Sequence, residues 1–224
     1  MPFPRCPFAR EEIPIIIMEN LKAKGFQMYD ATKGWTVDHF KITLLEMARF
    51  HAAGYHVIQH SRKGAVGLRE DFPLIADLGY EGIIQIKTES FKEEVGKSIS
   101  SVIKSGINII AQNMGDKDIL RRFRNWNVME GASNSLRPSE DFDVICRADS
   151  WSNNFLFKYD EESGKPVEVR FVDLQLAMRG RPTFDLAVLF ATSATPKMRR
   201  ENQECLLRLY HDCLLYTSPS PRDS

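Results

Sequence analysis

Apolar and polar positions alternate with two different periods along this chain, and the change of period predicts where helices give way to strands. The first helix is expected from about Val37, after Thr36 as a capping residue, to about His60, although Gly54 weakens its middle. Its apolar positions recur at threes and fours: Val37, Phe40, Leu44, Met47 and Ala48. Further helices are expected over 72–80, 90–110, 118–133, 185–193 and 197–215. The chain is therefore predicted to be mainly helical.

Short strand-like runs make up the remaining regular pattern. They are expected at 13–18, 142–146, 155–159 and 166–172. The first of them, IPIIIM, is apolar throughout and is typical of a buried strand. The last two flank a polar turn that contains Ser163 and Gly164, and apolar residues alternate with charged ones along the second. These two runs are expected to pair as an antiparallel hairpin.

This hairpin would bring side chains suited to metal binding and catalysis close together. If it closes between Ser163 and Gly164, the numbers of facing residues sum to 327, so Asn154 lies opposite Asp173. A wider turn would shift this register by a residue or two. Asp149 precedes Asn154 by five residues on the approaching loop. Two carboxylates and an amide are oxygen donors that suit Mg²⁺, with a general base beside it. The alternative is that Asp149 and Asn154 are turn residues and Asp173 is a cap.

Composition removes several classes of function. Thirty basic and thirty acidic residues cancel, which gives no electrostatic case for binding nucleic acid or an anionic membrane. No apolar run reaches the ~18 residues that a membrane-spanning helix needs, and no secretory signal opens the chain. The four cysteines show no CxxC spacing and are expected to be reduced thiols. A cytoplasmic protein without nucleic-acid partners is predicted.

Two short motifs are weaker than they look. The run 94–98, EVGKS, contains the Gly-Lys-Ser of a phosphate-binding loop, but that loop needs a glycine where this chain has Phe91. His56 and His60 have the spacing of zinc ligands, but the residue after the first is Val57 rather than glutamate. A solvated helix face for the first, and structural or surface histidines for the second, are the better interpretations.

Composition also divides the chain into three parts. Residues 1–12 are rich in proline and charge and are expected to be an irregular lead-in. Residues 13–215 carry all the periodic pattern and are expected to form the folded domain. Residues 216–224, YTSPSPRDS, change abruptly to serine and proline and are expected to be a disordered, possibly non-native tail.

Several motifs of the chain match a known family in order and spacing. They are Asp149-x-Trp151-x-x-Asn154, then Val172-Asp173-Leu174-Gln175, then Pro182-x-x-Asp185-Leu186. Together they resemble the catalytic stretch of the ecdysteroid kinase-like (CHK kinase-like) family, which is related to the aminoglycoside and choline phosphotransferases. Upstream, 15–26 is similar to the family's hinge strand, and 45–53 to its long helix that ends in Phe-His-Ala. The likeness covers roughly 13–215.

The resemblance implies a fold and a mechanism. The fold is of the α+β class: a protein-kinase-like C-terminal lobe, mainly helical, with a small antiparallel hairpin that carries the catalytic residues. Asp149 corresponds to the catalytic base, and Asn154 and Asp173 to the Mg²⁺ ligands on the ATP phosphates. The backbone of Met18, Glu19, Asn20 and Leu21 corresponds to the hinge that reads adenine. Asp185 is expected to brace the catalytic loop.

Two departures from the family pattern qualify the expected activity. The family has His-Gly before the catalytic aspartate, and this chain has Arg147-Ala148. About a dozen residues precede Ile13, too few for the lobe that carries the phosphate-covering loop and its lysine, so a fragment with weak or no catalysis is expected.

The family's acceptor would be an ecdysteroid or a similar lipophilic alcohol, phosphorylated with ATP and Mg²⁺. Two other readings stay open at this point. One is a non-catalytic pseudokinase module that binds a partner or ligand. The other is an incomplete gene model with no independent function.

Overall fold

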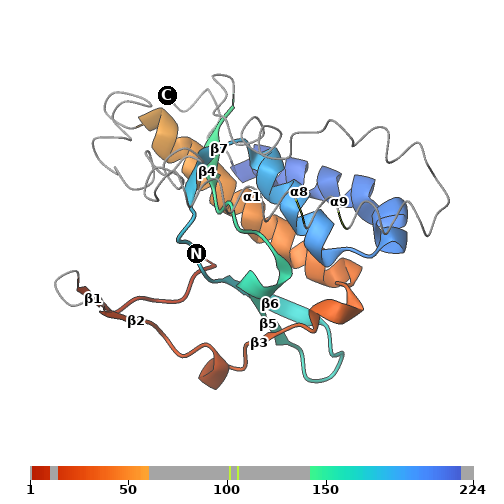
Figure 1. Ribbon diagram of the computed structural model, residues 1–224, viewed down its shortest axis with the longest axis horizontal. Helices are drawn as coiled ribbons and strands as arrows, with labels where there is room; N and C mark the ends of the chain where they lie inside the picture. The colour runs from red at the N-terminus through yellow and green to blue at the C-terminus, as the bar shows by residue number, and fades with distance from the viewer. Residues whose placement is uncertain (1, 11–14, 61–100, 102–104, 106–141, 218–224) are drawn as a thin grey trace.

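Three helices lie side by side in the computed structural model, which describes residues 2–10, 15–60, 101, 105 and 142–217. They are α1 (Val37–His60), α8 (Pro182–Ser193) and α9 (Pro196–Thr217). Figure 1 shows them stacked together, with the small sheets below and beside them. The first helix has the bounds that its apolar spacing predicts, and its buried face includes Phe40, Leu44, Met47 and Ala48. The predicted helices within 72–80, 90–110 and 118–133 lie outside the described residues.

Seven short strands pair antiparallel in the described residues. They are β1 (Phe8–Arg10), β2 (Ile15–Ile17), β3 (Gln27–Met28), β4 (Val144–Cys146), β5 (Phe155–Tyr159), β6 (Pro166–Phe171) and β7 (Met178–Gly180). β1 pairs with β2, β4 with β7, and β5 lies between β3 and β6. The chain thus mixes helix with small antiparallel sheets, as the α+β assignment expects.

The hairpin of β5 and β6 exists, but its register differs from the prediction. Phe155 faces Phe171 and Phe157 faces Val169, so facing numbers sum to 326 rather than 327. Asn154 therefore lies opposite Val172, whose backbone N–H donates to the Asn154 carbonyl at 3.1 Å. The prediction that Asn154 faces Asp173 is wrong by one residue. The cause is a turn wider than two residues, closed by a hydrogen bond from Asp160 N–H to the Lys165 carbonyl.

Strand β2 contradicts a second prediction. The run Ile15 to Met18 was expected to be buried, but these four side chains are 46–68% exposed. The two strands β1 and β2 pair only with each other in the described residues. Figure 1 shows this pair at the edge of the molecule, away from the three helices, and within the described residues its apolar side chains stay exposed.

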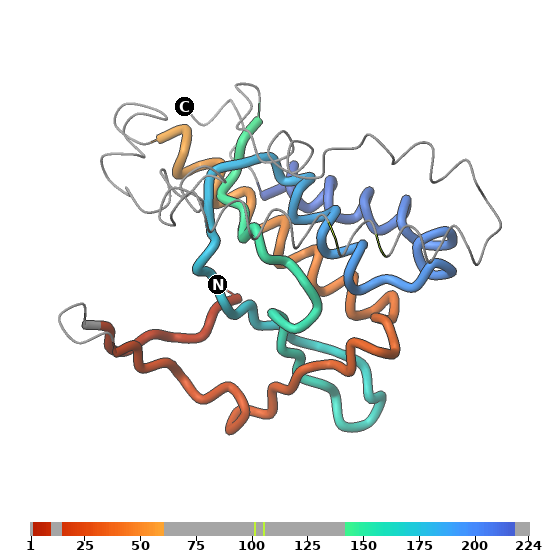
Figure 2. The backbone as a smooth tube through the Cα atoms, in the orientation of Figure 1, coloured from red at the N-terminus to blue at the C-terminus, as the bar shows by residue number. Residues whose placement is uncertain are grey.

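The ends of the chain are more ordered than composition suggested. The backbone N–H of Phe171 donates to the carbonyl of Pro2 at 2.6 Å. The ring of Phe3 packs edge-to-face on Phe50 and Phe171, with centroids 5.3 Å and 5.9 Å away. Figure 2 shows that the N-terminal segment begins near the centre of the molecule and then runs outward to β1. The lead-in is thus partly packed, and α9 continues to Thr217, two residues into the predicted tail.

Helix α8 begins three residues earlier than predicted because Pro182 occupies its first position. Proline lacks the backbone N–H that a first turn leaves unpaired, and its φ suits the helix. This start places Asp185 in the first turn of α8, where the carboxylate faces the loop after β4.

Aromatic side chains make up much of the core between α1 and the β5–β6 hairpin. The ring of Trp35 packs edge-to-face on Phe40, Phe155 and Phe157, with centroids 5.0–5.3 Å apart. Phe40 in turn stacks on Phe190 of α8 at 5.0 Å. One cluster therefore joins both helices to the strand that follows Asn154.

Candidate functional site

Asp185 organises the loop that follows β4. Its carboxylate is fully buried and accepts hydrogen bonds from the backbone N–H groups of Arg147 at 2.7 Å and Ala148 at 2.9 Å. It also accepts from Ser150 Oγ at 2.9 Å and contacts His51 Nε2 at 3.1 Å. Burial alone would raise the pKa of Asp185, but the hydrogen bonds from His51 and the Arg147 backbone hold it below its usual value. This aspartate braces the loop, as expected.

The loop turns sharply at Ala148. Its φ is 60°, the left-handed region in which a Cβ is unfavourable. Because consecutive N–H groups from Arg147 and Ala148 both reach one carboxylate, the backbone must curl around Asp185 at this point. The glycine of the family pattern meets the same requirement without strain. In this chain alanine adopts the left-handed conformation, and Asp149 follows directly after the turn.

Asp149 and Asn154 form the centre of the candidate site. The amide Nδ2 of Asn154 donates to both the backbone carbonyl and Oδ2 of Asp149, each at 2.9 Å. A short 3-10 turn, η3 (Ser152–Asn154), brings the two residues together just before β5 begins. Asn154 is buried and Asp149 is half-buried, so one side of the pair remains accessible.

Asp173 lies at the far end of the same hairpin. It follows Val172, which is hydrogen-bonded to Asn154, and its own φ of 62° turns the chain away from β6. Aspartate tolerates this left-handed conformation better than most residues. Its side chain is exposed, and Oδ2 accepts a hydrogen bond from Gln175 Nε2 at 3.4 Å. The hairpin thus carries Asn154 and Asp173 on adjoining ends of its two strands.

The oxygen donors at this end of the hairpin fit a magnesium ion. Since both hydrogen bonds from Asn154 Nδ2 go to Asp149, the opposite end of the amide presents Oδ1 as an acceptor. The exposed carboxylate of Asp173 supplies charged oxygens of the type that Mg²⁺ prefers. The donor set therefore suits a hard cation bound with phosphate groups.

Arg147 lies in the interior next to the backbone of Asn154 and Val172. Its side chain is fully buried, and its guanidinium lies over the rings of Phe155 and Phe171, 4.7 Å and 5.0 Å from the centroids. Nη2 donates to the carbonyls of Val172 at 2.5 Å and Asn154 at 3.5 Å. Burial lowers the pKa of Arg147 to about 10, against the opposing effect of nearby carboxylates, so the group stays charged at neutral pH.

The proposed hinge residues make local contacts. Glu19 pairs with Lys24 at 3.1 Å and accepts from the Arg5 backbone, while Asn20 Oδ1 accepts from the N–H of Ala23. Leu21 is buried and Met18 is about half exposed. Within the described residues, these polar contacts join the segment to Arg5, Ala23 and Lys24 rather than to the loop around Asp149.

A second group of metal-ligand types lies deeper in the fold. Potential ligand atoms of His51, Cys146 and Asp185 lie within 4.8 Å of one another, all buried. Each already has a partner: His51 Nδ1 contacts Tyr210 Oη at 2.7 Å, and the Cys146 thiol donates to the Arg181 carbonyl at 3.2 Å. Asp185 is saturated by the loop. A metal ion would have to displace these contacts, so the group is structural.

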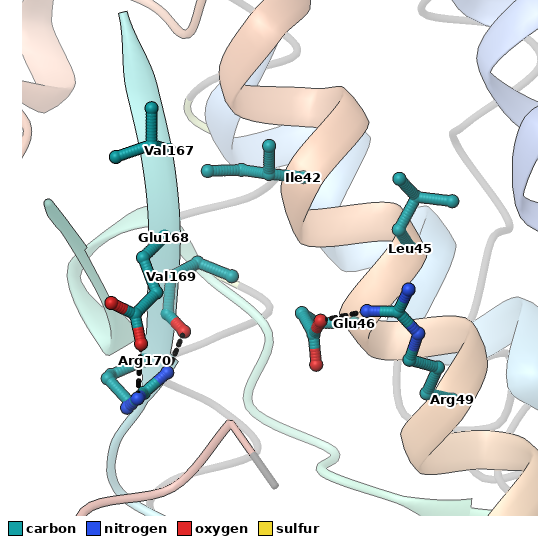
Figure 3. A pocket seen from close by; sticks show the side chains of 8 residues that line it. All are labelled: Ile42, Leu45, Glu46, Arg49, Val167, Glu168, Val169 and Arg170. Carbon is teal, nitrogen blue, oxygen red and sulfur yellow. Dashed lines mark hydrogen bonds and ion pairs between the residues drawn. The ribbon is translucent and has the colours of Figure 1, made fainter. Parts of the chain in front are cut away.

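A groove on another side of the hairpin does not include the candidate residues. It has a volume of about 380 Å³ and lies between α1 and β6. Figure 3 shows its lining side chains on these two elements, with an ion pair within each set: Ile42, Leu45, Glu46, Arg49, Val167, Glu168, Val169 and Arg170.

Sequence reasoning missed two parts of this arrangement. His51 belongs to the Phe-His-Ala run of α1, and its contact with Asp185 had no other sequence signal. The burial of Arg147 was not foreseen either, because a long cation after an apolar strand normally points toward solvent. Only the departure from the family's His-Gly marked this position in advance.

The comparisons with known proteins assign a family. The model of the ecdysteroid kinase-like family matches residues 1–218, and the chain belongs to that family of kinase-like phosphotransferases. The search of the curated proteins gave no match. Among solved structures, the chain is similar to the crystal structure of aminoglycoside-3'-phosphotransferase of type VIII. The identity is 14% and the TM-score 0.44, over 96% of this chain and 72% of that one. No helix in the described residues is long and apolar enough to cross a membrane.

Proposed function

We propose that this chain transfers the γ-phosphoryl group of ATP, with Mg²⁺, to a hydroxyl group of a small lipophilic alcohol of the ecdysteroid type. The observation that carries the proposal is the pairing of Asp149 with Asn154 on a loop that Asp185 braces. Phosphoryl transfer depends on positioning and charge neutralisation more than on covalent chemistry by the protein. A rigid loop with oxygen-bearing side chains meets both needs.

Asp149 would act on the acceptor hydroxyl. Its Oδ2 is held by Asn154, which leaves Oδ1 to accept a hydrogen bond from the alcohol and to receive its proton. The backbone on either side of it is restrained by Asp185 and by the turn at Ala148. The carboxylate therefore keeps one orientation while the alcohol oxygen attacks.

Asn154 and Asp173 would hold the metal, and the backbone of Met18 to Leu21 would contact adenine. When bound, Mg²⁺ neutralises phosphate charge during the transfer. The chain's own contribution is to present Asn154 Oδ1 and the Asp173 carboxylate from adjoining ends of one hairpin. A purely binding module would not need the Asp149 carboxylate there, so the site favours the enzyme over the pseudokinase alternative. The cytoplasmic location stays a prediction.

A phosphotransfer assay with Mg·ATP and a panel of hydroxysteroids tests this function. A fragment is expected to show weak or no turnover. Turnover that Asp149→Asn lowers by about 10²–10⁴-fold, because the amide cannot accept the proton, would support the proposed function over the fragment expectation. The matched control is Asp212→Asn, the same chemical change at an exposed position of α9, which should leave turnover unchanged. Equal turnover in wild type and Asp149→Asn would contradict the assigned role.

A further inference from the structure

The fully buried Arg147 is poorly satisfied by hydrogen bonds. Two of its three guanidinium nitrogens, Nε and Nη1, have no acceptor within the described part of the chain. Buried polar groups of native proteins almost always find partners, and a buried cation costs more than a neutral group. An explanation for its position therefore has to come from something other than hydrogen bonding.

The neighbours of the guanidinium belong to the end of the hairpin that carries the candidate site. The rings of Phe155 and Phe171 cover it and exclude water. The one nitrogen with acceptors binds the carbonyls of Asn154 and Val172, the residues that carry or precede the proposed metal ligands. This contact fixes the cation directly behind the end of the hairpin.

The positive charge of Arg147 interacts with nearby carboxylates, which an apolar side chain of the same size would not do. The carboxylates of Asp149 and Asp173 act on it electrostatically, together with that of Asp185. Charges in such a dry setting interact more strongly than they do in water. A single fixed positive charge therefore offsets part of the negative charge that would attract a divalent cation.

We propose that Arg147 selects the form in which metal enters the site: its fixed charge disfavours a bare divalent cation and favours an anionic metal–nucleotide complex. This inference rests on the proposed function, because it concerns the same metal ligands. A bare Mg²⁺ or Mn²⁺ ion is repelled by the guanidinium, whereas Mg·ATP carries net negative charge and is attracted to it. Removal of the charge should thus change the two affinities in opposite directions.

Three substitutions separate charge from shape. Arg147→Met keeps the length and apolar stem without charge, Arg147→Gln keeps an N–H donor for the Val172 carbonyl without charge, and Arg147→Lys keeps the charge. Arg208→Met, at an exposed position of α9, controls for the change in net charge. Free Mn²⁺ is titrated by electron paramagnetic resonance and Mg·ATP by calorimetry, after thermal unfolding has confirmed that each variant folds.

We expect Arg147→Met and Arg147→Gln to bind free Mn²⁺ about fivefold more tightly and Mg·ATP several-fold more weakly than wild type. Arg147→Lys and Arg208→Met should match wild type in both titrations. If only one uncharged variant folds, its comparison with Arg147→Lys still shows whether the charge changes the two affinities in opposite directions.

The outcomes that overturn the inference differ from those that overturn the function. If wild type binds both probes and the uncharged variants shift both affinities in the same direction, or shift neither, the charge does not select the metal form. The proposed function then survives. If neither wild type nor any folded variant binds Mn²⁺ or Mg·ATP, the metal site itself is wrong and both proposals fail.

Discussion

At the scale of single residues, the loop before Asp149 depends on two positions where this chain departs from its family pattern. Arg147 places a cation in the core, and Ala148 takes a left-handed backbone conformation that the family's glycine adopts without strain. Both are tolerated because Asp185 binds the two backbone N–H groups.

Ala148→Gly should stabilise the protein. A left-handed alanine costs about 1–2 kcal/mol, and the greater freedom of glycine in the unfolded chain offsets about half of this, so the free energy of unfolding should rise by about 0.5–1 kcal/mol. Urea denaturation followed by circular dichroism measures it. Ala187→Gly, the same change at an exposed position within α8, should instead lower stability by about 1 kcal/mol. A loss at both positions would argue against strain at Ala148.

At the scale of elements, the hairpin shows how a turn sets register. Asp160 Oδ1 accepts hydrogen bonds from Ser163 N and Oγ, at 2.8 Å and 2.7 Å. The N–H of Gly164 donates to the Asp160 carbonyl, and the N–H of Asp160 to that of Lys165. This polar turn is wider than a two-residue closure, and a shift follows between Lys158 and Tyr159. The strands were predictable from alternation, but their register was not, because side-chain hydrogen bonds shape the turn.

Gly54 lies where α1 packs closely against β4, so its lack of a side chain matters for packing and not only for helix propensity. A Cβ at this position would lie 2.6 Å from Ile145 N and 2.9 Å from Ile145 Cβ. Glycine weakens an isolated helix, but here it lets the strand that leads into the Asp149 loop approach closely.

Gly54→Ala should therefore destabilise the protein. Alanine gains about 1 kcal/mol in helix propensity, but the clash with backbone that cannot move aside costs more, and we expect a net loss of about 1–3 kcal/mol. The midpoint of urea unfolding measures this change. Because β4 leads to the Asp149 loop, the proposed phosphotransfer should fall as well. A variant more stable than wild type would show that β4 shifts freely.

At the scale of the whole molecule, His39 joins the start of α1 to the β3–β5–β6 sheet. Its ring nitrogens contact Thr36 Oγ1 at 2.7 Å and Tyr159 Oη at 2.9 Å, and the ring packs on Tyr29 and Phe157. Burial lowers the pKa of His39 to about 4, although Asp38 acts in the opposite direction. The native protein thus holds this histidine neutral at pH values where the unfolded chain would protonate it.

Stability should fall as the pH drops from about 6.5 toward 4, because the unfolded chain then binds a proton that the folded protein excludes. At pH 5 this single group would cost up to about 2 kcal/mol relative to pH 7.5. Urea unfolding at the two pH values measures the loss, and His39→Gln should remove most of it. His56→Gln, at an exposed position of α1, should not. An equal loss in all three proteins would assign the effect to other groups.

Much of this architecture could be read from local pattern. The spacing of Phe40, Leu44 and Met47 predicted α1 with its observed bounds, and the alternation after Pro166 predicted β6. Motif order pointed to Asp149, Asn154 and Asp173 as one site. The exposure of Ile16 could not be foreseen, because burial depends on which other layer covers a strand and not on the strand's own composition.

By itself, then, the sequence determined the family, the main elements and the residue types of the site, since these follow from short-range periodicity and motif spacing. Only the tertiary structure decided that Asp185, 37 residues beyond Ala148, curls the loop around its carboxylate. It also decided that Arg147 points inward between two aromatic rings. Contacts between distant segments decide both, because the partners of a buried charge are set by packing, which local pattern does not encode.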